Sequence, residues 1–487
     1  MPATTAPSDH LNINELPSEL LENILDYLPL SDRKRASLVC QLWCNLAMSQ
    51  RAMKNVALRI GSDSLMYNAK LLQNSWRPYR VLQIYLTHRL SIENDDTNIL
   101  AVLNKFGPTL EEFSLNASCT TNVMAKILWK LPQLRTLDIF ICDWFKSVEK
   151  HHFPILQNLH TLRLINGGFG DLEIDIVQWA PNARNLQLNA SIYTDEERWF
   201  HALDSYKPHL KSLNISYRTW HKIPLNRLTL PQLEKLEIDH YTYGDLLGLT
   251  NVFPTSAPVL TTIRLNFKIT HQILHTISER WPHLQELMFI LPDVSDNNML
   301  RPLEEFKHLR KLHIQGFVTA NILEQLKALP TVQEFVLSLE PTVDAIGLAY
   351  NLSLLLPNVQ TLNISDIGQH GNEFLRGICE YFTSLRRLDV NNLAHNDEYN
   401  MDAFNRLGLL IHLEELSLQR MKIRLGALPP NNLRRLKLSR VVLLDMRISS
   451  NLANIFPKLQ FLGITGILQR HIEPIRQQFV GCVIHCE

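Results

Sequence analysis

A short pattern of apolar residues recurs along most of the chain and constrains its fold more than any other feature. In Leu134–Ile139 the first, fourth and sixth positions are apolar, and the pattern recurs at a mean spacing of about 25 residues. We call the first residue of each copy its anchor. The anchors are Leu110, Leu134, Leu159, Ala183, Leu210, Leu233, Leu260, Leu284, Leu309, Val332, Val359, Leu385, Leu413, Leu433 and Leu459.

The pattern predicts one short strand in each copy. Positions four and six are two residues apart, so on an extended chain they face the same side, while positions three, five and seven face solvent. Because a single strand cannot bury its apolar side alone, neighbouring copies must stack. The spacing lies within the roughly 20 to 29 residues of leucine-rich repeats. We therefore expect an α/β fold, a leucine-rich-repeat solenoid shaped as a curved horseshoe, with a parallel sheet on the concave side and helices on the convex side.

Proline supports the register of the copies. In ten of the fifteen copies a proline stands two residues before the anchor, as in Pro132, Pro231 and Pro457. Proline lacks the amide hydrogen that a continuing helix needs, and it favours an extended conformation in the preceding residue. Each of these prolines is therefore expected to end a helix just before a strand begins.

The segment before the repeats has a helical pattern instead. Leu20, Leu21, Ile24, Leu25 and Leu28 fall on one helical stripe, which Pro29 ends. The apolar residues that follow, up to Met53, predict two further short helices. We expect a small bundle of three helices.

This segment resembles the F-box, the helical motif by which substrate receptors dock onto the Skp adaptor of SCF ubiquitin ligases. It departs from the usual family pattern at Arg33, where an aliphatic residue is common, and at Met53, near where a Leu-Trp pair is common. The residues that carry the resemblance are Leu16, Pro17, Leu20, Leu21, Ile24, Leu25, Tyr27, Leu28, Pro29, Leu30, Asp32 and the run from Ala36 to Trp43.

The resemblance implies a set of adaptor-binding residues. The alternative is a simple cap that shields the first repeat, which every solenoid needs, but a cap does not require the combined Leu-Pro, Leu-Val-Cys and Trp sequence. The residues implied to lie at or beside the adaptor are Leu16, Pro17, Leu20, Ile24, Leu38, Val39, Cys40 and Trp43.

The sequence predicts four consecutive regions. Residues 1–12 form a disordered tail, and residues 13–54 form the F-box. Residues 55–105 form an irregular transition with a first atypical repeat around Leu82 and Ile84. Residues 106–487 form the solenoid, with a closing strand in the apolar stretch 479–484.

Composition narrows the class of protein. The formal net charge is zero, which argues against a nucleic-acid partner or an acidic membrane surface. The seven cysteines are odd in number and scattered, which favours reduced thiols over a disulfide framework. Without a signal-peptide pattern or an apolar run long enough to span a membrane, we expect a cytoplasmic or nuclear protein.

Two groups of histidine or cysteine residues have spacings that a metal site could use. Cys482, His485 and Cys486 do not all face one side of an extended chain, and a structural strand explains them better. His271 and His275 are four apart on an expected helix, but the glutamate of a His-Glu-x-x-His motif is missing, so surface histidines are favoured. We predict no metal, no cofactor and no catalytic residue.

The concave face is where a partner should bind, because positions three, five and seven of successive strands form one extended surface. These positions become more basic towards the C-terminus. Arg387, Arg435 and Lys437 occupy positions three or five, so they are candidates for binding an acidic or phosphorylated segment of a target. A solvated charged face is the alternative.

The leading hypothesis is a non-catalytic, substrate-recruiting subunit of an SCF-type E3 ubiquitin ligase. The F-box would bind the Skp adaptor, and through it a cullin, while the concave repeats bind an unknown protein substrate. The alternative is a non-degradative leucine-rich-repeat scaffold. An enzyme would need a convergent acid, base or metal set that the pattern does not show. A receptor gated by a small molecule stays open within the leading class.

Overall fold

The structure is a computed structural model. Its described residues are 13–61, 65–86, 96–117, 119–140, 144–145, 152–165, 176–190, 196–217, 225–240, 253–292, 298–316, 323, 326–338, 344–365, 371–391, 404–443, 452–466, 475, 477–479 and 482–486. The expected tail, residues 1–12, lies outside them. The chain divides into two compact units, which are described separately: Met1–Lys211 with Ile215–Lys222, and Ser212–Asn214 with Ile223–Glu487.

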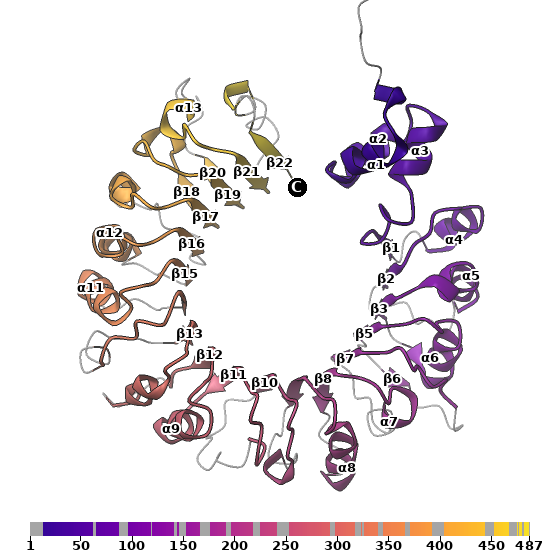
Figure 1. The fold of residues 1–487 in the computed structure, drawn as a ribbon, viewed down its shortest axis with the longest axis horizontal. Coiled ribbons are helices and arrows are strands. Elements are labelled where there is room, and N and C mark those ends of the chain that lie inside the picture. The colour runs from indigo at the N-terminus through magenta and orange to yellow at the C-terminus, as the bar shows by residue number, and fades with distance from the viewer. Residues whose placement is uncertain are drawn as a thin grey trace, which may run out of the picture. The chain divides into compact units, whose positions relative to one another are not determined.

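The first unit begins with three short helices, which we call the N-terminal bundle (Figure 1). A short 3-10 helix, η1 (Ile13–Glu15), is followed by α1 (Ser18–Asp26), α2 (Leu30–Ala36) and α3 (Gln41–Ala47). Leu25, Ala36 and Ala47 form its buried core, and Leu28, Trp43 and Leu46 pack against this core.

A ladder of strands with helices on one side makes up the rest of the first unit (Figure 1). Its main-sheet strands are β1 (Ala57–Gly61), β2 (Val81–Tyr85), β3 (Glu112–Asn116), β5 (Thr136–Phe140), β7 (Thr161–Ile165) and β8 (Asn185–Ala190); β9 (Ser212–Tyr217) lies where the two units divide. Its helices are α4 (Leu65–Gln73), α5 (Asp96–Phe106), η4 (Gly107–Thr109), α6 (Thr121–Leu128), α7 (Ile176–Trp179) and α8 (Glu196–Tyr206).

The second unit repeats the same arrangement. Its main-sheet strands are β10 (Lys235–His240), β11 (Thr262–Lys268), β12 (Glu286–Ile290), β13 (Lys311–Gln315), β14 (Glu334–Ser338), β15 (Thr361–Ser365), β16 (Arg387–Asn391), β17 (Glu415–Gln419), β19 (Arg435–Ser439), β21 (Phe461–Thr465) and β22 (Val483–Cys486). Its helices are η7 (Leu225–Arg227), α9 (His271–Arg280), η9 (Arg301–Glu305), α11 (Ala345–Leu355), α12 (Gly371–Tyr381), η10 (Phe404–Leu409), η11 (Leu425–Ala427) and α13 (Leu452–Ile455).

The strands confirm the pattern seen in the sequence. The described residues contain 18 main-sheet strands, and equivalent positions of neighbouring copies lie opposite one another in parallel pairs, as Leu137 does opposite Leu162. Positions four and six are buried in every copy. All anchors are buried as well, except Leu459, which is half-buried. The fold is therefore a parallel-sheet solenoid with helices beside the sheet, preceded by a small helical bundle.

The prolines act as expected at the ends of helices. Helix α9 ends at Arg280, and Pro282 lies in the next turn, which Leu284 closes by donating its amide to the Trp281 carbonyl at 3.1 Å. Strand β12 then begins at Glu286. The anchor thus follows the turn and is fixed in the core before the strand starts.

Three features differ from the sequence expectations or go beyond them. Strand β1 forms although its anchor position is the polar Asn55, which is why the pattern missed it. The last strand begins at Val483 rather than Phe479 and pairs in parallel with β21. Two small sheets of two strands each also form: β4 (Cys119–Thr120) pairs with β6 (Trp144–Phe145), and β18 (Lys422–Ile423) with β20 (Val442–Leu443). None of the described helices is long and apolar enough to cross a membrane.

Candidate functional site

The N-terminal bundle exposes apolar side chains that its own core does not need. On α1, Leu21 and Leu25 are 1 % and 2 % exposed, whereas Leu20 and Ile24 are 49 % and 42 % exposed. The single stripe expected from the sequence is thus two stripes with different roles. Leu20 and Ile24 are four residues apart, so they lie next to each other on the helix surface.

A third side of α1 is held by the segment after α3. Arg51 forms an ion pair with Asp26 at 3.1 Å and donates a hydrogen bond to the Asn23 amide oxygen at 2.9 Å. Ser49 donates its hydroxyl hydrogen to Glu22. Because these contacts occupy the polar side of α1, its Leu20 and Ile24 side is the one left exposed.

The link between α2 and α3 adds further exposed apolar groups. Leu38 and Val39 are 85 % and 63 % exposed, and Cys40, the extended residue that precedes α3, is exposed. Trp43 is half-buried, and its indole nitrogen donates to the Asn14 amide oxygen at 2.8 Å. Trp43 therefore packs against the core of the bundle and hydrogen-bonds to the exposed Asn14 through its indole nitrogen.

The other two expected adaptor-binding residues lie at the start of α1. Pro17 is exposed and Leu16 is half-buried. Three exposed apolar residues of the bundle were not among the expected ones: Ile13, Tyr27 and Leu42. Tyr27 could have been found from its spacing, since it follows Ile24 by three residues, which places the two on one side of the helix.

Both departures from the F-box pattern have a role inside the bundle. Arg33 is half-buried, and its guanidinium donates to the Ala52 carbonyl at 2.7 Å, which ties α2 to the segment after α3. Met53 is buried, like the neighbouring Met48. These residues hold the bundle together, and neither is one of its exposed apolar side chains.

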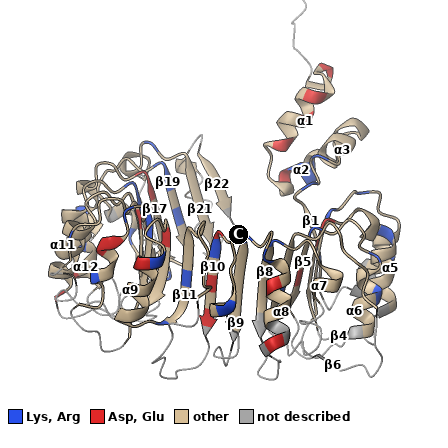
Figure 2. Ribbon diagram, turned by 60° about the horizontal axis from the view of Figure 1, so that its bottom comes forward, with Lys and Arg blue, Asp and Glu red and all other residues tan. Residues whose placement is uncertain are grey.

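The second unit brings the three expected cations of the repeats together on what we call the strand face, the side chains at positions three, five and seven of the strands. Arg387 on β16 and Arg435 on β19 lie on either side of Glu415 on β17, at 3.8 Å and 3.5 Å from its carboxylate. Acidic and basic segments both occur in the region of β17 and β19 (Figure 2). The sequence had identified the cations but not the carboxylate between them.

A second carboxylate lies beside the same group. Arg387 contacts Asp389 at 3.1 Å. Burial raises the pKa of Asp389, although Arg387 and Lys437 act in the opposite direction. Lys437 is exposed on the strand after Glu415. The group therefore carries alternating charges, and an anionic ligand would compete with Asp389 and Glu415 for the two arginines.

His313, at position five of its copy on β13, should make the stability of the fold depend on pH. Burial, with Lys311 and Arg264 nearby, lowers the pKa of His313 to about 4. The unfolded chain takes up this proton near pH 6.5 and the folded chain does not, so the unfolding free energy should fall as the pH drops from about 6.5 to about 4. In His313→Gln this fall should be smaller. Urea midpoints of both proteins between pH 4 and 7.5 test this, and parallel curves would contradict it.

The histidines and cysteines that could form metal sites lie in or just before β22 and on α9. Cys482 lies just before β22, and His485 lies within it. The rings of His271 and His275 on α9 are 6.1 Å apart between centroids. Within the described ranges, no group of three or more His, Cys, Asp or Glu side chains is arranged to hold a metal ion.

Comparison with known proteins identifies the N-terminal bundle. Residues 13–54 match the family model of the F-box domain. No curated protein matches the chain. Among solved structures, the chain is similar to one titled "Crystal structure of TLR13-ssRNA13 complex", with 16% identity over 84% of this chain and 70% of that chain and a TM-score of 0.40. It is also similar to one titled "Crystal structure of Rad7 and Elc1 complex in yeast", with 14% identity over 96% of each chain and a TM-score of 0.39.

The N-terminal bundle is therefore an F-box domain, followed by a solenoid like that of leucine-rich-repeat proteins. An F-box suggests an adaptor that binds Skp proteins in SCF-type ligases, and proteins of this class are generally not catalysts.

Proposed function

We propose that this chain is a substrate-recruiting subunit of an SCF-type E3 ubiquitin ligase. The F-box would bind the Skp adaptor, and through it a cullin, while the strand face of the repeats binds the target protein. The observation that carries the proposal is the exposed apolar surface of the F-box: Leu20, Ile24, Leu38 and Val39 are solvent-accessible in a bundle whose core is complete without them. Exposed apolar surface of this kind marks an interaction site.

The chain would contribute binding rather than bond chemistry. A receptor that holds a target near a conjugating enzyme raises the local concentration of the target's lysines. The proposed contacts to an acidic or phosphorylated segment of the target are Arg387, Arg435 and Lys437. Lys437 would be contacted first, since the two arginines already contact carboxylates.

Co-purification with the Skp adaptor tests the first half of the proposal. Replacing both Leu38 and Val39 by alanine should weaken adaptor binding about 100-fold, because each lost apolar contact is worth about 1.5 kcal/mol. The control is Leu354→Ala with Ile411→Ala, two apolar residues of the second unit that are also largely exposed, at 57 % and 62 %. The control should bind like the wild type.

The rate of Cys40 alkylation is an independent test of adaptor binding to the F-box. Cys40 is exposed, whereas Cys119 and Cys379 are buried, and burial raises the pKa of Cys379 to about 12, which leaves little reactive thiolate. Adding the adaptor should slow the alkylation of Cys40. An adaptor that neither co-purifies with the wild type nor protects Cys40 would contradict the proposal. A target that binds this protein but has the same half-life in its presence and absence would instead favour a non-degradative scaffold.

A further inference from the structure

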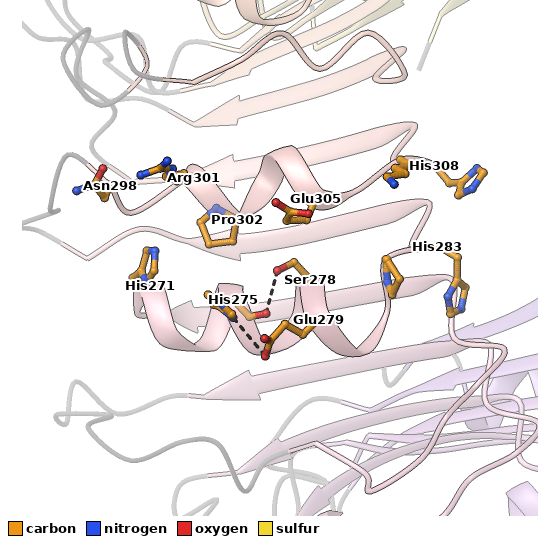
Figure 3. Close-up of a pocket in the computed structure, with 12 residues that line it drawn as sticks. His271, His275, Ser278, Glu279, His283, Asn298, Arg301, Pro302, Glu305 and His308 are labelled. Atoms are coloured by element: carbon orange, nitrogen blue, oxygen red, sulfur yellow. Dashed lines mark hydrogen bonds and ion pairs between the residues drawn. The ribbon is translucent and has the colours of Figure 1, made fainter.

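A groove with four histidines lies on the helix side of the second unit, away from the strand face. It runs between α9 and η9 and has a volume of about 940 Å³, in the range of ligand-binding pockets. Figure 3 shows side chains from both elements pointing into it. Neither the F-box nor the strand face includes any of these residues.

The lengths of the two neighbouring helices explain why the groove is open. Helix α9 has 10 residues, whereas η9, its counterpart in the next repeat, has only 5. Helix α9 uses Ile273, Leu274 and Ile277 to cover the core. The opposite stripe carries His271, His275 and Glu279 at intervals of four residues, and these side chains face the space that the shorter η9 leaves uncovered.

Positive and hydrogen-donating groups gather at the ends of the groove. His271, Asn298 and Arg301 lie near one another at one end, and His283 and His308 lie at the other (Figure 3). The acidic side chains Glu279 and Glu305 lie between the two ends. The titratable or charged groups that line the groove are His271, His275 and Glu279 of α9, His283 after it, Arg301 and Glu305 of η9, and Lys307 and His308 after it.

Glu304 of η9 and Glu279 of α9 already have ion-pair partners. Glu304, which acts electrostatically on Arg301, forms its ion pair with Lys327 at 3.1 Å and also accepts the Lys327 amide hydrogen. Glu279 pairs with His275 at 3.3 Å. Across the described part of the chain, neither Arg301 nor Lys307 has a carboxylate within ion-pair distance. As far as the described residues are concerned, an anion at the Arg301 end would not have to displace an ion-paired carboxylate.

We propose that this groove binds a short phosphorylated segment of a partner protein, with the phosphate at the Arg301 end. A phosphate offers three acceptor oxygens, enough for the guanidinium and an imidazole together. The 10 residues of α9 span about 15 Å, and an extended chain rises about 3.3 Å per residue. The groove thus matches about four or five residues of an extended peptide. The site is independent of adaptor binding.

Fluorescence anisotropy with a synthetic peptide tests the site in the full chain. The probe is a fluorescein-labelled hexapeptide of glycine and alanine with one central phosphoserine, titrated at pH 7.5, where the phosphate carries nearly two negative charges. Arg301→Gln should weaken binding about tenfold through the loss of charge-assisted hydrogen bonds. Arg280→Gln is the matched control, since Arg280 is exposed on α9 but does not line the groove. His271→Gln removes the imidazole at the same end of the groove and should also weaken binding.

Four outcomes would overturn the proposal. They are no binding to the wild type, equal binding of the peptide without phosphate, equal weakening by Arg280→Gln, and inorganic phosphate binding as tightly as the peptide, which would indicate a site for the free anion. Circular dichroism of each variant shows whether the fold is retained. Adaptor co-purification should be unchanged in Arg301→Gln, so failure here is distinguishable from failure of the proposed ligase role.

Discussion

Replacing Leu21 by alanine should unfold the F-box and abolish adaptor binding, although Leu21 is only 1 % exposed and cannot itself reach a partner. Truncating a buried leucine to alanine costs about 2 to 5 kcal/mol. The F-box spans only residues 13–54, and the core of so small a domain rarely supplies more than about 3 to 5 kcal/mol. One substitution therefore removes most of its stability. Hydrogen exchange of the amides in α1, with adaptor co-purification, measures both effects.

The neighbouring residue is the matched control for this prediction. Leu20→Ala is the same change one position earlier, but Leu20 is 49 % exposed. It should leave amide protection unchanged and weaken adaptor binding about tenfold, because one partly exposed apolar contact is lost. If Leu20→Ala lost protection as Leu21→Ala does, the division of α1 into a core stripe and a partner stripe would be wrong.

The repeats could be predicted from the sequence because each copy repeats the same spacing and every core position must be apolar. The division between Leu20 and Leu21 could not, since adjacent residues of one broad apolar stripe look alike until the packing is known. Here the packing is set by Ser49 and Arg51, far from α1 in the sequence, which hold its polar side. Helical periodicity alone does not contain that information.

The charged surfaces could likewise be predicted only in part from the sequence. Alternation along the strands predicts that Arg387, Arg435 and Lys437 share one face, because that depends only on local geometry. Their partner Glu415 comes from the strand between them, so the balance of charge appears only when the strands are aligned. The histidine groove depends on the different lengths of two neighbouring helices, α9 and η9, and its function as a phosphopeptide site stays a prediction.

Replacing Phe335 by alanine should lower the unfolding free energy of the second unit by about 3 to 5 kcal/mol. Phe335, at position four of its copy, is fully buried on β14. It lies opposite Leu312 on β13 and Leu362 on β15 in the parallel pairing of the strands. In a stacked array each unit depends on its contacts with its neighbours. The cavity should therefore loosen β13 and β15 as well as β14. Urea unfolding gives the size of the effect, and hydrogen exchange gives its location.

Val336→Ala is the matched control, because Val336 is the next residue of the same strand and lies half-buried on the strand face. It should cost less than about 1 kcal/mol, in line with surface substitutions away from the core. Exchange should accelerate around β14 in Phe335→Ala and not in Val336→Ala. Equal effects of the two substitutions would mean that both faces of β14 contribute alike to stability, and the separation of a packed core from a strand face free to bind partners would then fail.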